Sequence, residues 1–227
     1  MSEQFLDTRV GIYGGTFAPV HNAHVATAKL FMEQMRLDYL FVIPSAIPPH
    51  KEIDPLDDPM HRLRMCELAF EGMEGVIVSD MEIERGGKSY TYDTVKALSA
   101  KGRRLLLLCG TDMVLSFDTW YKYREILELC YPVYMRREKD AMLDGMIVNK
   151  LTKYYNESGK MFRKLVGEPI ELNSTHIREA VKAGRSISNM VPSAVEKYIM
   201  IMDRDFIVPI KLNWQKNGHV LKKCLLM

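Results

Sequence analysis

The chain has 227 residues, of which 47% are hydrophobic and 26% are charged, so it can bury a sizeable core and has the composition of a globular protein. Its formal net charge is +2, which is too balanced for broad binding to DNA or RNA, so any recognition of phosphate has to be local. No apolar stretch is long enough to cross a bilayer, and the N-terminus lacks the basic and then apolar run of a signal peptide.

Four cysteines are scattered along the chain without a Cys-x-x-Cys pair: Cys66, Cys109, Cys130 and Cys224. This spacing fits neither a disulfide framework nor a zinc site, so they are interpreted as reduced, mostly buried thiols. We therefore expect a cytoplasmic protein with no nucleic-acid or membrane partner.

Short apolar runs alternate with helical patterns over most of the chain. Strands are predicted at residues 10–13, 40–43, 76–78, 105–108 and 133–135. Helices are predicted from the spacing of Val25, Ala28, Phe31, Met32 and Met35, from Asp58-Pro59 followed by Leu63, Cys66 and Phe70, and over residues 92–98. Continuous apolar strands that alternate with helices predict an α/β fold, a Rossmann-like doubly wound parallel sheet with helices on both faces.

The last third of the chain is less regular. Residues 140–164 look helical but polar, and Pro192 opens an amphipathic helix with Val195, Tyr198, Ile199 and Met202 on one face. We expect one α/β domain over residues 1–202, with a C-terminal helical part from about residue 174. Residues 203–227 form an extension to which the sequence assigns no role.

The first chemical motif follows the first strand and runs from Gly14 to His24. Ligands of an open parallel sheet bind beyond the carboxyl ends of its strands. Two glycines allow close approach of a phosphate, and the helix that begins here offers free N–H groups. His21 and His24 share one face of its first turn and could stabilise charge that develops during phosphoryl transfer. A metal pair is the alternative for these histidines, but no nearby cysteine or carboxylate completes a metal shell.

The second motif reads Asn173-Ser174-Thr175-His176-Ile177-Arg178. Ser174 or Thr175 is a natural helix cap, and a hydroxyl and an arginine at a helix start can hold the outer phosphates of a nucleotide. Taken alone, the segment is better explained as a capped helix with a surface arginine.

Together the two segments resemble the signature motifs of the nucleotidylyltransferase superfamily, which is related in fold to class I aminoacyl-tRNA synthetases. Further segments narrow the resemblance to bacterial nicotinate-nucleotide adenylyltransferases. These are residues 47–51, His61-Arg62, residues 89–95, residues 110–113 and Trp120-Tyr121-Lys122, all in register between about Val10 and Met202.

This resemblance implies that the 5′-phosphate of nicotinate mononucleotide attacks the α-phosphorus of ATP in line, giving nicotinate adenine dinucleotide and pyrophosphate. Magnesium would accompany ATP and be held largely by phosphate oxygens and water, so no metal site made of protein ligands is expected. The expected partners are these two small molecules, and a homo-oligomer is possible.

The resemblance also implies site residues. ATP would be bound by Gly14, Gly15, Thr16, Phe17, His21, His24, Asp112, Ser174, Thr175, Ile177 and Arg178, of which His21, His24 and Arg178 would be catalytic. The mononucleotide would be bound by Lys51, Ser89, Tyr90, Thr91, Asp112, Trp120 and Tyr121. A pyridinium ring stacks well on an indole, and N–H groups near Thr91 and Tyr121 could bind its carboxylate. Without the resemblance, Trp120 and Tyr121 could be core residues and Lys51 an exposed lysine.

Two positions depart from the family pattern. Ala18 stands where the family usually has Asp, and Ala23 where it usually has Gly. The loss of a carboxylate at position 18 could loosen the loop and lower the rate. The alternatives therefore remain another nucleotidylyltransferase, of phosphopantetheine or cytidylyl type, or a nucleotide-binding module without turnover.

Overall fold

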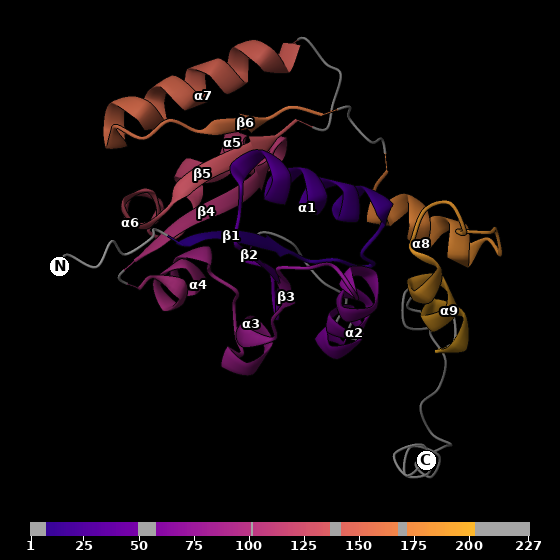
Figure 1. Cartoon of the computed structure of the whole chain (residues 1–227). Helices are drawn as coiled ribbons and strands as arrows, with labels where there is room; N and C mark the ends of the chain where they lie inside the picture. Colours follow the sequence, from indigo (N-terminus) through magenta and orange to yellow (C-terminus); the bar gives the residue numbers. More distant parts are fainter. Residues whose placement is uncertain (1–7, 50–57, 101, 137–141, 168–171, 203–227) are drawn as a thin grey trace.

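The computed structural model describes residues 8–49, 58–100, 102–136, 142–167 and 172–202. Their strands form one six-stranded, all-parallel sheet in the order β3-β2-β1-β4-β5-β6 (Figure 1). The strands are β1 (Thr8–Gly15), β2 (Tyr39–Pro44), β3 (Val76–Val78), β4 (Arg103–Gly110), β5 (Tyr131–Met135) and β6 (Arg163–Leu165). The predicted doubly wound parallel sheet is confirmed.

Helices connect the strands and continue beyond the last one. They are α1 (Asn22–Met35), α2 (Pro59–Phe70), α3 (Met81–Arg85), α4 (Thr91–Leu98), α5 (Thr111–Ser116), the 3₁₀ turn η1 (Phe117–Thr119), α6 (Tyr123–Leu129), α7 (Met142–Ser158), α8 (Ser174–Lys182) and α9 (Ser193–Ile201). No helix within the described ranges is long and apolar enough to span a membrane.

Two hydrophobic clusters lie on the two faces of the sheet. Successive side chains of β4 point to opposite faces of the sheet. Leu106 and Leu108 therefore belong to one cluster, and Leu105 and Leu107 to the other. Helices α1, α2, α8 and α9 contribute to the first cluster, and α4 to α7 to the second. A sheet buried on both faces explains why its central strands are continuously apolar.

The helix starts follow local sequence signals. Asp58 caps α2, because its carboxylate accepts a 2.8 Å hydrogen bond from the Met60 N–H, and Pro59 stands at the first helical position, as predicted. At the start of α1, the Asn22 N–H donates to the carbonyl of Met190, 2.9 Å away. This bond ties α1 to the loop between α8 and α9.

The prediction for residues 140–164 is wrong at its C-terminal end. Helix α7 ends at Ser158, and Arg163–Leu165 pairs with β5 as the edge strand β6. Two of the three residues of this strand, Arg163 and Lys164, are charged and exposed. The strand therefore has no apolar run by which the sequence could predict it. The short helices α3, α5 and α6 were not predicted either.

The buried thiols agree with the sequence. Cys66, Cys109 and Cys130 are free and buried, while Cys224 lies outside the described residues. Burial raises the pKa of the Cys66 and Cys109 thiols well above their ordinary range, and that of Cys130 to about 12. All three therefore stay protonated at neutral pH and serve as core residues.

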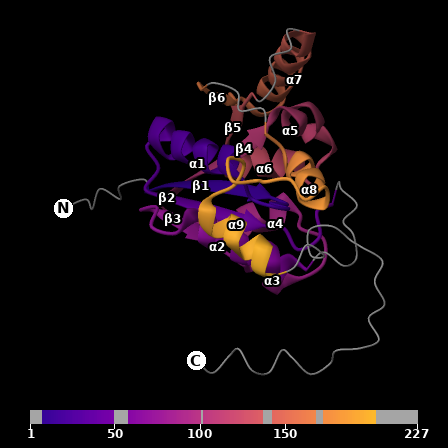
Figure 2. The same cartoon turned by 90° about the vertical axis from the view of Figure 1, so that its right-hand side faces the viewer.

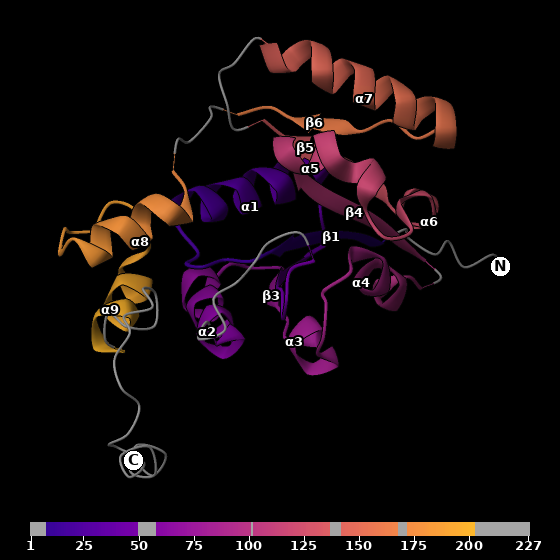
Figure 3. The ribbon, with the colours of Figure 1, turned by 180° about the vertical axis from the view of Figure 1, so that it is seen from behind.

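The order of the strands decides where a ligand can bind. From β1 the sheet continues through β2 and β3 on one side and through β4, β5 and β6 on the other. The crevice beyond the carboxyl end of β1 is thus the switch point of the sheet. Figures 2 and 3 show α8 at one end of α1 and α9 beside α2, so the C-terminal helices lie next to this crevice.

Candidate active site

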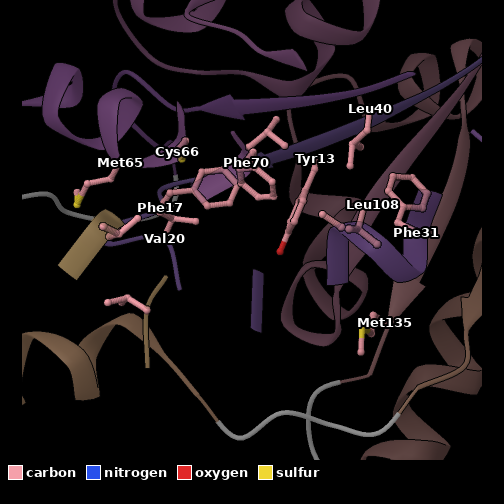
Figure 4. Close-up of a cluster of buried hydrophobic side chains, with 14 of the residues drawn as sticks. Tyr13, Phe17, Val20, Phe31, Leu40, Met65, Cys66, Phe70, Leu108 and Met135 are labelled. Atoms are coloured by element: carbon pink, nitrogen blue, oxygen red, sulfur yellow. The ribbon is translucent and has the colours of Figure 1, made fainter. Parts of the chain in front are cut away.

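The loop after β1 is anchored by one aromatic side chain. Phe17 has the left-handed backbone angle φ 51° and is 2% exposed. Its ring lies edge-on to Tyr13 and His24, with centroids 5.4 and 5.0 Å apart, and it belongs to the buried cluster in Figure 4. A non-glycine residue in this conformation is strained, so the buried ring is what keeps the loop in place.

Gly14 borders open space next to this anchor. A Cβ added to Gly14 would meet no atom within 4 Å, whereas one added to Gly15 would lie 3.0 Å from the ring of Phe17. The backbone at Gly14 can therefore be approached by a ligand, and Gly15 is needed for the close fit of Phe17.

His21 and His24 form a stacked pair at the start of α1. Their ring centroids are 3.6 Å apart at an interplanar angle of 25°, and the His21 N–H donates to Nδ1 of His24 over 3.2 Å. Because Nδ1 accepts this bond, the proton of a neutral His24 ring is on Nε2. Nε2 of His24 is then a hydrogen-bond donor. The His24 ring is partly exposed, whereas His21 is buried, so His24 is the histidine that can contact a phosphate.

The second motif touches the loop of the first. The Ser174 hydroxyl donates to the carbonyl of Pro19 at 2.9 Å, and Nη1 of Arg178 donates to the carbonyl of Ala18 at 2.8 Å. Nη2 of Arg178 also donates to the hydroxyl of Thr175 at 3.0 Å. Segments more than 150 positions apart in the sequence thus form one site. Arg178, expected to hold phosphates, also fixes the loop that carries Ala18.

The helix cap of this second motif was assigned to the wrong residue. Asn173 caps α8, since its side chain accepts a 2.8 Å hydrogen bond from the His176 N–H, and Ser174 and Thr175 are already inside the helix. Because Asn173 makes the cap, the Ser174 hydroxyl can donate its hydrogen bond to the Pro19 carbonyl. Ile177 is fully buried beneath the helix and packs in the core.

A shallow recess opens beside the histidines. It is lined by Tyr13, His21, Ala23, His24, Thr27, Met135 and Leu172. The ends of β1 and β5, the start of α1 and the segment before α8 therefore border one hollow. Ala23, at the position where the family pattern has Gly, forms part of its wall.

Two tyrosines of the predicted pyridine pocket lie together. The rings of Tyr90 and Tyr121 are 4.9 Å apart, and Tyr121 is 48% exposed. Lys122 lies over this cluster, with Nζ 5.3 Å from the Tyr121 ring centroid and 4.5 Å from that of Tyr92. The cluster is a partly exposed aromatic surface with a positive charge beside it.

Trp120 is placed differently from its predicted stacking role. It is 9% exposed and packs on Phe117, with ring centroids 4.8 Å apart at 34°. In this conformation its indole belongs to the hydrophobic core, and Tyr121 is the exposed ring of the pair. The alternative of core packing therefore describes the Trp120 side chain here.

Ser89 is buried next to the aromatic cluster of Tyr90 and Tyr121. Its hydroxyl oxygen accepts a 2.8 Å hydrogen bond from the Ala46 N–H and is bonded to Glu82. Burial raises the pKa of Glu82, although hydrogen bonds from Thr94 and Ser89 oppose this rise. Ser89 thus connects the loop after β2 with Tyr90 and Thr91 at the start of α4.

Two predicted residues remain, Asp112 and Lys51. Asp112 is exposed in α5, at the carboxyl end of β4, next to the switch point. Lys51 lies outside the described residues. Within the ranges that the structure describes, no group of three or more His, Cys, Asp or Glu side chains could hold a metal ion.

Sequence reasoning missed the role of Arg62, although it noted the residue within a motif. Arg62 is 1% exposed and donates to the carbonyls of Thr16, Ser45 and Ala46. An arginine on a helix is usually exposed, so nothing in the sequence signals this burial.

The sheet order and the joined motifs at its switch point define a nucleotide-binding α/β protein of the nucleotidyltransferase class. Residues 12–180 match the family described as "Cytidylyltransferase-like".

Curated relatives narrow this class. The chain is 34% identical over 209 residues to a protein of Desulfatibacillum aliphaticivorans, with 84% of this chain and 96% of that one covered. It is 37% identical over 205 residues to one of Citrifermentans bemidjiense, with 84% and 95% covered. Both are named "Probable nicotinate-nucleotide adenylyltransferase". The chain belongs to the nicotinate-nucleotide adenylyltransferase family.

A solved structure supports the fold. Plasmodium falciparum nicotinic acid mononucleotide adenylyltransferase, complexed with NaAD, superimposes with a TM-score of 0.67 at 16% identity, over 88% of this chain and 97% of that one.

Proposed function

We propose that this chain transfers the adenylyl group of ATP to nicotinate mononucleotide, giving nicotinate adenine dinucleotide and pyrophosphate. The observation that carries the proposal is the contact of Ser174 and Arg178 with the Pro19 and Ala18 carbonyls, beside His21 and His24. It unites the two nucleotide-binding motifs in one site at the switch point of the sheet. The family to which the chain belongs agrees with this reaction.

The chemistry needs positioning and charge stabilisation. An oxygen of the mononucleotide 5′-phosphate forms a bond to the α-phosphorus of ATP, while the bond from that phosphorus to the oxygen bridging to the β-phosphate breaks and pyrophosphate leaves. The attacking phosphate is already an anion, so no general base is required. Nε2–H of His24 and the loop N–H groups would donate hydrogen bonds to the charged phosphate oxygens, and Arg178 would add positive charge beside them.

We propose that ATP enters the reaction with a bound magnesium ion. The ion would be held by phosphate oxygens and water, and it would neutralise charge on the triphosphate. This mode of binding needs no metal site made of protein side chains, and the described residues contain none. We place the reaction in the cytoplasm, and a homo-oligomer remains an expectation from the sequence.

The acceptor pocket would favour nicotinate over nicotinamide. The partly exposed rings of Tyr90 and Tyr121 offer an electron-rich surface to a pyridinium, and Lys122 places a positive charge next to them. Nicotinate carries a carboxylate where nicotinamide has a neutral amide, so the lysine charge and free N–H groups near Thr91 and Tyr121 would attract the acid more strongly.

The test is pyrophosphate release by purified protein with ATP and magnesium, comparing nicotinate mononucleotide with nicotinamide mononucleotide. Fast release with the acid and slow release with the amide are expected. Release with neither acceptor would contradict the proposal. If such a protein still binds ATP, it would be a nucleotide-binding module without turnover.

A further inference from the structure

A buried arginine connects the two loops that border the site. The Arg62 guanidinium, 1% exposed on α2, donates from Nη1 to the carbonyls of Thr16 at 3.0 Å and Ser45 at 2.6 Å, and from Nη2 to that of Ala46 at 3.1 Å. Burying a guanidinium is unfavourable unless its N–H groups find acceptors. Here the acceptors are backbone carbonyls of the loops after β1 and β2, so the charge is used to fix loop geometry.

This bond sets the direction of a hydrogen-bond donor. In a trans peptide the C=O of one residue and the N–H of the next point in opposite directions. Since the Thr16 carbonyl points to Arg62, the Phe17 N–H points away from it. In the same way the Gly15 carbonyl accepts from the Ser45 N–H at 2.9 Å, which turns the Thr16 N–H to the other side. Neither N–H donates to any residue that the structure describes.

The peptide between Thr16 and Phe17 needs this support. Phe17 has φ 51°, a conformation that a non-glycine residue keeps only when its surroundings hold it. The buried ring fixes the side chain, and Arg62 fixes the carbonyl on the other end of the peptide. Without Arg62, the peptide could rotate and its N–H would lose its direction.

The same guanidinium reaches the acceptor side. Ala46, whose carbonyl accepts from Arg62, donates its own N–H to the Ser89 hydroxyl at 2.8 Å. Ser89 precedes Tyr90 of the aromatic pocket. A continuous chain of hydrogen bonds thus runs from the loop after β1 to the start of α4.

We propose that Arg62 is a positioning residue of the adenylyl transfer: it holds the Phe17 N–H group aimed at the reacting phosphates and keeps this loop in register with the acceptor pocket. The inference rests on the proposed function. Arg62 acts through the backbone, so its loss weakens the contact of the loop with the ATP phosphates and, more strongly, with the charge that develops in the transition state.

The test compares Arg62→Ala with Arg64→Ala in the full-length protein. Arg64 lies on the same helix with a 54% exposed side chain and pairs with Glu67 at 2.7 Å, so its replacement controls for loss of a cation from α2. We expect Arg62→Ala to lower kcat about 100-fold, comparable to losing one donor to a developing oxyanion, and to raise KM for ATP about tenfold, with KM for nicotinate mononucleotide within about threefold of wild type. Arg64→Ala should keep wild-type kcat.

Guanidinium at millimolar concentration should restore part of the lost kcat by occupying the vacated space. A purely structural defect would not improve, because guanidinium destabilises folded proteins. Arg62→Lys keeps the charge but lacks the planar fork, so it should remain at least about tenfold impaired. If Arg62→Ala does not fold, Arg62→Lys carries the test. A folded variant with wild-type kcat, or a loss confined to KM, would overturn the inference.

A binding measurement tests the role of Arg62 independently of the proposed function. If wild-type protein releases no pyrophosphate with any acceptor, the proposed function fails. Calorimetry with inorganic pyrophosphate then tests Arg62 alone. The inference predicts at least about tenfold weaker binding to the arginine variant, and equal affinity overturns it.

Discussion

His24 makes a structural contact with His21, and we propose a second, chemical contact with phosphate; mutation can separate the two. Its Nδ1 accepts the His21 N–H, and its other nitrogen can donate to phosphate. We expect His24→Ala to lower kcat about 10²- to 10³-fold through lost charge stabilisation. The lost bond to the helix start should cost only about 1 kcal/mol of unfolding free energy, so the protein stays folded.

Steady-state kinetics and thermal unfolding of the same preparation measure both effects. His176→Ala is the matched control, because His176 is exposed in the first turn of another helix, α8. Wild-type turnover by folded His24→Ala protein would rule out the proposed role.

A loop weakened by Ala18 was expected, since the family resemblance implies Asp at this position. The structure holds this loop through backbone carbonyls instead, with Arg178 on Ala18 and Ser174 on Pro19. Restoring the carboxylate in Ala18→Asp should therefore change kcat by less than about threefold. A tenfold or larger increase in measured kcat would show that the loop of this chain is short of a stabilising contact.

At the residue scale, the sequence predicts chemistry better than placement. The histidine pair follows from residue types and spacing, because residues three apart share a helix face. The contact of both motifs was expected only from the family resemblance. Three placements could not be read in this way: the burial of Arg62, the burial of Trp120 and the capping by Asn173. The two burials depend on which side of an element faces a neighbour that is distant in sequence, whereas the cap is a local choice among the adjacent residues Asn173, Ser174 and Thr175.

Helix α8 depends on its cap. Asn173→Ala removes the acceptor for the His176 N–H and should cost about 1 kcal/mol, a fall in Tm of about 2–4 °C for a chain of this size. Because α8 carries Ser174 and Arg178, KM for ATP should rise as well. Asn173→Asp keeps a capping oxygen and should stay close to wild type in both measurements. Equal losses in the two variants would show that capping is not the cause.

Helix α7 is tied to the 3₁₀ turn η1 by Asp118. Hydrogen bonds from Lys150 at 2.8 Å and Lys153 at 2.6 Å lower the pKa of this carboxyl to about 2. Since the folded pKa lies below the ordinary one, the stabilisation is present above pH of about 4 and is lost as the pH falls toward 2. Asp118→Asn should therefore lower unfolding free energy at neutral pH, with a smaller difference in acid.

Urea unfolding of wild type and Asp118→Asn at pH near 7 and near 3 measures this difference. A gap that is equal at the two pH values would contradict an ionic origin. Lys150 and Lys153 are 32% and 43% exposed, so solvent screening keeps the effect small.

At the element scale, the sequence predicts long apolar strands and the amphipathic helices well. It fails on β6 and on α3, α5 and α6, each too short to show a period. Strand β6 gains its stability from pairing with β5 at the edge of the sheet, and exposed Arg163 and Lys164 give it a polar sequence.

At the scale of the molecule, alternation predicts the fold class, but the strand order comes only from the structure. The order β3-β2-β1-β4-β5-β6 places the end of β1 at the switch point, and α8 returns to it from the other end of the chain. The ATP site that we propose depends on this meeting of distant segments, since each motif supplies only part of it.

The central claim is that this site joins an adenylyl group to nicotinate mononucleotide. The most direct measurement is one reaction that contains ATP, CTP and magnesium with equal amounts of nicotinate mononucleotide, nicotinamide mononucleotide and phosphopantetheine, followed by mass spectrometry of the products. We expect nicotinate adenine dinucleotide to form first, with one pyrophosphate released for each dinucleotide. Adenylylated phosphopantetheine, a cytidylylated product, or no product at all would contradict the claim.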